Sequence, residues 1–442
     1  MSKHLHEIRC PIHVFVRLDS DERAVLDSRP FQRLRHIHQL ALTYLIYPAA
    51  THKRFEHSLG VMELAGRVFD VVTNPSNVTD AIRGELPELL QPDKLAYWRR
   101  VVRMAALCHD MGHLPFSHAA EKELLPEGWD HERLTRDIIR GDEIGTIFTK
   151  MRPPLVAEDV EKLAVGPRKA KNLTFTTWET ILSEIIVGDS FGVDRMDYLL
   201  RDSYHAGVSY GRFDHYRLID TLRILPAGSE ENAVPALGVE EGGLQSAEAL
   251  LLGRYYMYLQ VYFHSVRRIY DIHLKDFLEA WLDGGKFPTD IESHLKITDN
   301  NVNAAIYDAA IDPTAKGHDA ARRIARHDHF KVLYQRDPDD VQINPYAGHA
   351  VYEAAKAKFG PENVRHDGPV ENKEEKPKKE RTSFFPVLCR GDRIVDSGKL
   401  SDVLRSLPTV KWDFVFINPD LLVAARAWLK ENRAQLIRPP KE

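Results

Sequence analysis

An adjacent histidine and aspartate, His109 and Asp110, close an apolar stretch with helical spacing in the run AALCHDMGHLPFSH. Adjacent helix residues point about 100° apart, so they rarely share a task. One task they can share is to hold a single metal ion from two sides, because an imidazole nitrogen and a carboxylate oxygen both suit divalent transition metals. Two ligands alone hold a metal poorly. The pair therefore predicts a fold in which other helices bring further ligands to the same point.

Two other segments offer such ligands. His57 lies in HKRFEHSLGV, and Asp194 lies in FGVDRMDYLLRDS. With the first pair they supply two nitrogens and two oxygens, and this set leaves coordination positions for water and a phosphate oxygen. Taken singly, each of these residues is better explained as a hydrogen-bonded core or surface residue. Taken together, they predict a metal-dependent phosphohydrolase.

Further charged and titratable residues surround the candidate ligands: His113, His118, His131, Arg54 and Arg195. A phosphate-ester hydrolase needs a proton donor for the leaving oxygen, and histidine suits this task because its pKa lies near neutrality. Basic side chains beside the metal would hold a triphosphate. The alternatives are that the histidines cap helix ends and that the arginines are solvated surface charges.

The composition limits the class of protein. Lysine and arginine number 60 against 65 acidic residues, a formal charge of −5, which argues against a dedicated nucleic-acid binder without excluding nucleic acid as a partner. Three isolated cysteines form neither a disulfide framework nor a CxxC zinc site. We find no apolar signal region at the N-terminus and no run of membrane-spanning length. A cytoplasmic protein without a membrane partner is expected.

Helical spacing of apolar residues dominates the first half of the chain. It predicts that one helix face runs through 31–40. Residues 179–202 are expected to be helical with an interruption at 188–192. The apolar stretch at 247–281 is expected to be one long, largely buried helix.

The pattern changes after about residue 285, where short helices and turns follow. Apolar runs at 384–389 and 413–417 then alternate with helix-like stretches, which predicts a small α/β lobe on a helical body. The expected fold is mainly α, with a helical core and a smaller α/β C-terminal lobe. The expected divisions are a phosphohydrolase core at 1–285, a helical extension at 286–370, a charged linker or loop at 371–381 and the α/β lobe at 382–442.

Four motifs in one order, FQRLRHIHQL, THKRFEHSLGV, CHDMGHLPFSH and VDRMDYLLRDS, resemble those of the HD-domain deoxynucleoside triphosphate (dNTP) triphosphohydrolases. The resemblance covers roughly residues 5–275. It implies an HD-domain core that hydrolyses dNTPs to deoxynucleoside and inorganic triphosphate. Spacing alone does not establish attack at the α-phosphorus. An HD phosphohydrolase for a ribonucleotide, an alarmone or a nucleic-acid end is the alternative, and a non-enzymatic binding module is a third, which the intact metal set disfavours.

The resemblance implies a role for each matching residue. The residues that match metal ligands are His57, His109, Asp110 and Asp194. The residues that match catalytic histidines are His113, His118 and His131, of which the last is the expected proton donor. The residues that match substrate contacts are Gln39, Leu40, Arg54, Arg195, Tyr198, Asp202 and His264. Arg195 and Gln260 stand where the human member of the family carries a lysine and an arginine, which puts the exact triphosphate pose in doubt.

The resemblance also implies partners. One divalent ion is expected per site (Mn, Fe, Mg or Zn, as cellular availability decides), and additional Mg can accompany the nucleotide. Some family members are nucleotide-activated tetramers, so a homo-oligomer, either a dimer or a tetramer, is expected. The residues that match a regulatory guanine site are Asp27, Gln32 and Arg35. Cys10 and Val14 replace an aspartate and a glycine of that site, so its specificity is altered or the site is lost.

Overall fold

The computed structural model describes residues 5–117, 121–228, 233–369 and 384–438. The chain forms two compact units, each assembled from three segments. The first unit comprises Met1–Met257, Lys286–Asn301 and Thr382–Leu407. The second unit comprises Tyr258–Gly285, Val302–Arg381 and Pro408–Glu442. The mainly α fold with a smaller α/β C-terminal region is confirmed. The charged run at 371–381 lies outside the described residues, and the domain boundaries expected from the sequence stay a prediction.

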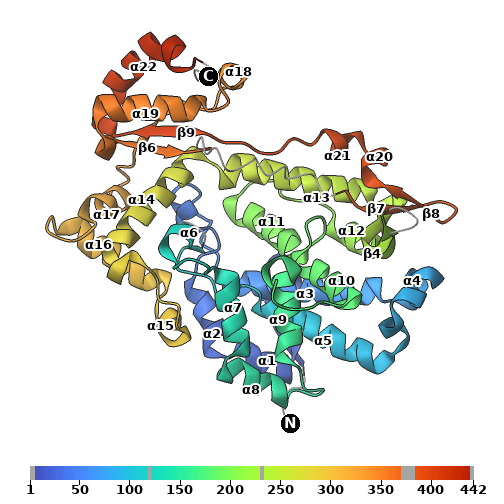
Figure 1. The fold of residues 1–442 in the computed structure, drawn as a ribbon. Coiled ribbons are helices and arrows are strands. Elements are labelled where there is room, and N and C mark those ends of the chain that lie inside the picture. The colour runs from blue at the N-terminus through green and yellow to red at the C-terminus, as the bar shows by residue number, and fades with distance from the viewer. Residues whose placement is uncertain (1–4, 118–120, 229–232, 370–383, 439–442) are drawn as a thin grey trace. The chain divides into compact units, whose positions relative to one another are not determined.

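The first unit is built around five helices that pack on one another (Figure 1). They are α3 (Arg54–Val72), α5 (Pro92–Cys108), α9 (Ala157–Lys169), α10 (Thr177–Val187) and α11 (Val193–Ala206). Helix α3 is buried on most of its faces, which its apolar sequence allows. The expected interruption between α10 and α11 is confirmed at residues 188–192. These helices carry the residues that the motifs singled out.

The remaining helices are divided between the two units. In the first unit they are α1 (Ser20–Leu26), α2 (Arg29–Arg33), α4 (Asp80–Glu85), α6 (Glu121–Leu124), α7 (His131–Arg140), α8 (Asp142–Lys150), α12 (His215–Thr221), α13 (Leu244–Met257), α15 (Ile291–Lys296), α20 (Ser397–Leu400) and α21 (Asp402–Ser406). In the second unit they are α14 (Ser265–Trp281), α17 (His318–Ala325), α18 (Pro338–Ile343), α19 (Ala347–Phe359) and α22 (Leu422–Leu436). Helix α16 (Asp299–Ile311) begins in the first unit and continues into the second. Among the described residues, no helix combines the length and apolarity needed to cross a bilayer.

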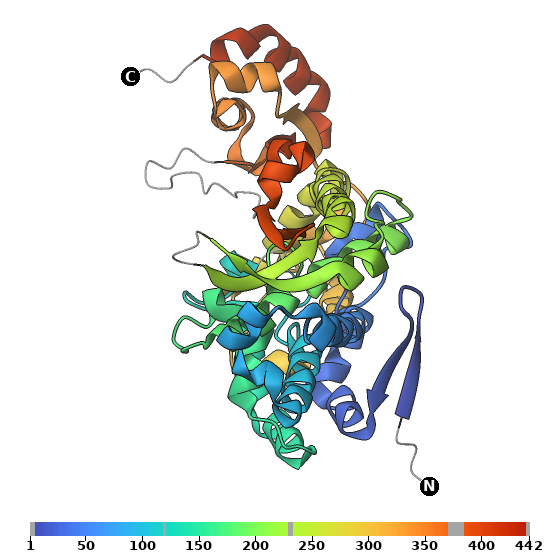
Figure 2. The ribbon, with the colours of Figure 1, turned by 90° about the vertical axis from the view of Figure 1, so that its right-hand side faces the viewer.

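Within the described residues the strands form three small sheets. In the first unit β1 (Leu5–Cys10) and β2 (Val14–Asp19) form an antiparallel hairpin, the dark blue ribbon in Figure 2. A four-stranded sheet in the same unit has the order β3 (Leu222–Ala227), β4 (Val234–Glu240), β7 (Pro386–Cys389) and β8 (Arg393–Asp396). The second unit holds an antiparallel sheet in the order β5 (Lys331–Gln335), β9 (Phe414–Ile417) and β6 (Val364–Asp367). Both C-terminal apolar runs are therefore strands, as expected, but they join different sheets.

The single helix expected over 31–40 is not formed. Helix α2 passes into a 3₁₀ turn at Leu34–His36, and the backbone is extended at Ile37. His38 then pairs with Lys53 in a β-bridge, and its amide donates to Asp299. These long-range hydrogen bonds outweigh the local helical spacing.

The long helix expected over 247–281 is also interrupted. Helix α13 is followed by a π-helical segment at Tyr258–Tyr262, and α14 begins only at Ser265. The wide turn is closed by the Phe263 amide, which donates to the Tyr258 carbonyl at 2.9 Å. Apolar spacing does not report such an inserted turn, because the side chains stay largely apolar across it.

Asp299 fixes the loop that follows the His109–Asp110 pair. Its buried carboxylate accepts the amides of His38 at 2.7 Å and Phe116 at 2.8 Å, and it contacts the His38 ring at 2.6 Å. We expect Asp299→Ala to lower the free energy of unfolding by about 3–5 kcal/mol, because buried donors lose their acceptor. Urea denaturation measures the change. Asp312→Ala, which removes an exposed turn carboxylate, should leave the midpoint nearly unchanged, and equal effects of the two would contradict the assignment.

Candidate metal centre and active site

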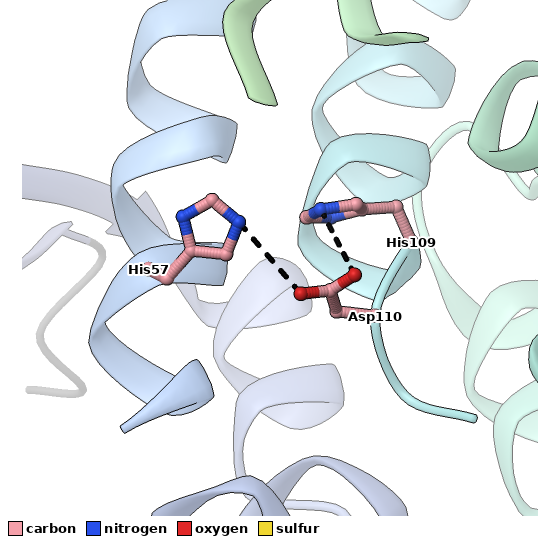
Figure 3. A group of neighbouring side chains, drawn as sticks. All are labelled: His57, His109 and Asp110. Carbon is pink, nitrogen blue, oxygen red and sulfur yellow. Dashed lines mark ion pairs between the residues drawn. The ribbon is translucent and has the colours of Figure 1, made fainter. Parts of the chain in front are cut away.

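Three helices bring the four predicted ligands together. His57 lies on α3, and His109 and Asp110 lie at the end of α5, with their ligand atoms within 4.8 Å of one another (Figure 3). Asp194, in the first turn of α11, places its Oδ1 3.1 Å from His57 Nε2 and 3.5 Å from His109 Nε2. The Asp194 side chain is 30% exposed, whereas the other three are buried, so the cluster opens to solvent on the Asp194 side.

The chemistry of this cluster fits a cation. His109 Nδ1 lies 2.8 Å from the Ala106 carbonyl, so Nδ1 carries the proton and Nε2 presents a lone pair. That Nε2 is buried and has no hydrogen-bond partner among the described residues. It faces carboxylate oxygens of Asp110 at 3.3 Å and Asp194 at 3.5 Å. A lone pair and two carboxylates repel one another unless a positive charge lies between them. A set of two nitrogen and two oxygen ligands suits a divalent transition metal.

The electrostatics of the cluster agree with this reading. Burial alone would raise the pKa of Asp194, but the neighbouring His109 and His57 hold it below its usual value. Burial would likewise raise the pKa of Asp110, but the charge of Arg54 holds it well below its usual range. For His57, burial opposes protonation, yet hydrogen bonds to Asp194 and Asp197 raise its pKa to about 10. A proton on His57 thus holds the place that a cation would take.

The raised pKa of His57 predicts proton-linked metal binding. Below about pH 10 the metal-free site carries this proton, and a cation must displace it. We therefore expect the apparent Mn²⁺ affinity to rise by up to about tenfold per pH unit between about pH 6 and pH 8, with release of one proton. Titration calorimetry in two buffers of different ionisation enthalpy counts that proton. Affinity independent of pH, without proton release, would contradict the assignment.

Two histidines that are expected to be catalytic lie beside the candidate ligands in opposite electrostatic environments. The rings of His113 and His131 stack with centroids 3.9 Å apart. Burial and the charge of Arg54 hold the pKa of His113 well below its usual value. Burial also opposes protonation of His131, but the hydrogen bond to Glu121, at 2.7 Å, raises its pKa. Such a split between neighbouring groups is typical of acid–base sites. The third expected histidine, His118, lies outside the described residues.

Arg54 contacts one of the candidate metal ligands directly. Its buried guanidinium forms an ion pair with Asp110, and its Nε donates to Ser117 Oγ at 2.8 Å. The residue begins α3, one turn before His57, so the same helix delivers a metal ligand and a cation to one point. The arrangement can hold a cation and a phosphate group side by side.

Comparisons with known proteins agree with this geometry. An HD domain model matches residues 54–174, and an HD associated region matches 213–359. A hypothetical protein from Aquifex aeolicus, solved as a crystal structure, has a TM-score of 0.74 and 32% sequence identity, covering 96% of this chain and 100% of that one. This chain belongs to the HD-domain phosphohydrolase family.

Sequence relatives of this HD protein include one named enzyme. Uncharacterized protein YwfO of Bacillus subtilis is 36% identical over 61% of this chain and 54% of its own length. Human deoxynucleoside triphosphate triphosphohydrolase SAMHD1 is 29% identical over 74% of this chain and 54% of its own. The chain thus spans about half the length of the curated relatives it matches.

The expected sugar-contacting residues of this HD protein lie near the ligand helices or within them. Asp202, on α11, is buried and contacts His52 Nε2 at 2.7 Å. The Gln39 amide donates to the His52 carbonyl at 3.0 Å, and the neighbouring Leu40 is buried. Tyr198 is half-buried on α11, one turn before Asp202. The backbone of this region therefore links the Gln39 segment to the Asp202 side chain through His52.

Two other expected substrate residues have different surroundings. Arg195 donates to the Gly188 carbonyl at 2.9 Å and pairs with the Asp189 carboxylate at 3.0 Å, so it is tied to the α10–α11 loop. His264 belongs to the second unit, where it caps α14 by accepting the Val266 amide. The substrate roles of both residues stay predictions.

Of the three expected regulatory residues, Gln32 and Arg35 contact each other, whereas Asp27 has a different partner. Gln32 accepts a hydrogen bond from Arg35 at 2.9 Å and donates to the Leu26 carbonyl at 2.8 Å. Asp27 instead pairs with Arg23, one turn earlier on α1, at 2.7 Å. Asp27 and Arg35 are both exposed, so they are accessible to a ligand. A nucleotide at this position stays a prediction.

Sequence reasoning missed two carboxylates that support the site. Asp197 contacts His57 Nδ1 at 2.8 Å, and Glu121 contacts His131. Burial alone would raise the pKa of Asp197, but the charge of Arg201 holds it well below its usual range. The signal for Asp197 was its position one helical turn after Asp194. Glu121 carried no comparable signal, because it lies ten residues before the histidine that it contacts.

Proposed function

We propose that this HD-domain hydrolase is a metal-dependent dNTP triphosphohydrolase that releases a deoxynucleoside and inorganic triphosphate. The observation that carries the proposal is the convergence of four nitrogen and oxygen ligands with an arginine and two oppositely shifted histidines. SAMHD1, whose name states its activity on dNTPs, supports the substrate class. A divalent ion bound by His57, His109, Asp110 and Asp194 would neutralise phosphate charge and lower the pKa of water.

The chain's own residues supply the remaining chemistry. Arg54, now paired with Asp110, offers its guanidinium to the phosphates when substrate enters. His131 donates its Nε2 proton to the leaving oxygen of the deoxynucleoside, and Glu121, which accepts a hydrogen bond from Nδ1, favours the protonated ring. His113 stays neutral and packs against the donor ring. Gln39, Leu40, Tyr198 and Asp202 contact the sugar in this proposal, and close packing there excludes a 2′-hydroxyl.

A second candidate function is hydrolysis of another nucleotide or phosphodiester by the same metal centre. The observation that favours it is the attachment of Arg195 to the loop at residues 188–189, which removes one of the expected triphosphate contacts. A ribonucleotide, an alarmone or a nucleic-acid end would then be the substrate. The metal ligands and the proton donor would keep their tasks.

A substrate panel tests both. Purified protein is incubated with each dNTP and each NTP, with Mn²⁺ or Mg²⁺, and the products are separated by ion exchange. Deoxynucleoside plus triphosphate, with ribonucleotides untouched, is the expected result. The absence of triphosphate under every condition would overturn the dNTP assignment and send the test to phosphodiesters and alarmones. The same panel run on metal-stripped protein is the control.

We also propose that the protein is a cytoplasmic homo-oligomer with a nucleotide-binding site at Asp27, Gln32 and Arg35. The exposed position of Asp27 and Arg35 supports this site. Turnover that requires added GTP or a mixture of dNTPs would support activation by nucleotide, and size-exclusion chromatography with light scattering would report the assembly. A constant mass and a single-substrate rate unaffected by GTP would count against it.

A further inference from the structure

The ring of His57 is held at its second nitrogen by a buried carboxylate. Asp197 Oδ2 lies 2.8 Å from His57 Nδ1, and both side chains are fully buried. Arg201, one turn further along α11, donates two hydrogen bonds to the same carboxylate, at 2.8 and 2.9 Å. A carboxylate paired in this way only accepts hydrogen bonds, so Nδ1 keeps its proton when Nε2 is bound. The contact therefore presents the Nε2 lone pair to the other ligands.

The fourth hydrogen bond to Asp197 comes from the N-terminal hairpin. His13 lies in the turn between β1 and β2, is 2% exposed and places Nε2 2.6 Å from Asp197 Oδ1. The next residue, Val14, has φ 65°, a conformation that branched residues rarely adopt, although its side chain is 51% exposed. A turn is held in such a conformation only where its surroundings fix it, and the inward His13 contact does so. Four hydrogen bonds saturate the carboxylate's acceptor capacity.

Close packing on α3 completes the arrangement. A Cβ built on Gly60 would lie 1.9 Å from Asp197 Oδ1 and 2.5 Å from Arg201 Nη2, so only glycine lets α3 approach this pair. Cys10, at the end of β1, adds a long contact to Arg201 at 3.6 Å. Three elements thus meet on one carboxylate: the hairpin, the helix that carries His57 and the helix that carries Asp194.

We propose that Asp197 and His13 are positioning residues that fix His57 for metal binding, and that the N-terminal hairpin sets the metal affinity of the site through them. The inference rests on the proposed metal centre. Residues that orient a metal-binding histidine alter metal affinity by about 10–100-fold when changed. His13 acts one hydrogen bond further away, so its effect is smaller.

Titration of metal-stripped, full-length protein with Mn²⁺ tests the inference. Asp197→Asn should weaken binding by about 10–100-fold and His13→Phe by about fivefold. The double variant should be no weaker than Asp197→Asn alone, because His13 acts through Asp197. Glu179→Gln is the matched control: it breaks a buried pair with Lys162, 2.9 Å long, in the same unit and away from the hairpin. It should lower the melting temperature and leave the Mn²⁺ affinity unchanged.

The outcomes separate the inference from the function it rests on. If the wild-type protein binds no Mn²⁺ and no other divalent ion, the metal centre and the proposed function both fall. If the wild type binds Mn²⁺ and folded His13→Phe binds it equally well, the inference alone falls. Should Asp197→Asn fail to fold, the comparison of His13→Phe with Glu179→Gln still decides. A merely structural role of His13 would lower the melting temperature, as Glu179→Gln does, and leave the Mn²⁺ affinity unchanged.

Discussion

Asp110→Ala should abolish metal binding and reduce hydrolysis by about 10³-fold or more, while the helical fold persists. Asp110 is the ligand that also pairs with Arg54, so its loss removes a metal contact and the partner of a phosphate-binding cation together. A bound metal ion contributes several kcal/mol to transition-state charge stabilisation, which corresponds to this factor. The measurements are kcat with the nucleotide identified by the substrate panel, Mn²⁺ titration and circular dichroism.

Asp70→Ala is the matched control for this variant. Asp70 lies on α3 and forms an exposed ion pair with Arg99, so its removal changes charge without touching the centre. We expect its kcat to equal that of the wild type. Asp110→Asn separates charge from volume, because the amide keeps an acceptor for Arg54. Turnover by metal-stripped Asp110→Ala at the wild-type rate would refute a metal-dependent reaction.

His131→Gln should lower kcat by about 10²–10⁴-fold with Mn²⁺ affinity unchanged, because the variant loses the proton donor and keeps all four ligands. The acid must carry its proton to act. Its raised pKa keeps it protonated to higher pH, and the rate falls as pH rises through that pKa. Glu121→Gln removes the charge that raises the pKa, so the alkaline limb of the rate profile should move to lower pH.

Glu123→Gln, an exposed change on the same short helix, should leave the profile in place. The pH dependence of kcat is measured with one nucleotide for the wild type, Glu121→Gln and Glu123→Gln. An alkaline limb that stays fixed in Glu121→Gln would show that His131 is not the titrating acid. Loss of Mn²⁺ binding in His131→Gln would show instead that the histidine supports the ligands.

The clustering of the four candidate ligands was predictable, because each lies in a short motif and metal binding is the task that their residue types share. The motifs alone were enough to select His57, His109, Asp110 and Asp194, without their distances in the folded protein. The residues that hold the candidate ligands in place were not predictable in this way. His13 and Asp197 are 184 positions apart, and each is an ordinary buried polar residue until the fold joins them. Local sequence patterns do not indicate such long-range pairs.

The predicted elements failed where tertiary contacts replace local ones. The apolar residues at 31–40 are buried as their spacing suggests, but His38 leaves the helix to meet Asp299 and Lys53. The strands at 386–389 and 414–417 were found by their apolar runs, yet neither run indicates which sheet it joins. Pairing partners are chosen by distant segments, so sequence patterns give the elements more readily than their neighbours.

Asp299 has a consequence for the order in which the active site is assembled during synthesis. It holds the amide of Phe116, 183 positions earlier, and the Ile297 carbonyl shares Arg33 with the carbonyl of His113. The loop after the His-Asp pair therefore lacks its anchor until residues near 300 have left the ribosome. The matched HD segment at 54–174 does not contain all the residues that fix the loop after its His-Asp pair. A nascent chain that ends before Asp299 carries all four candidate metal ligands but lacks the carboxylate that holds the loop after two of them.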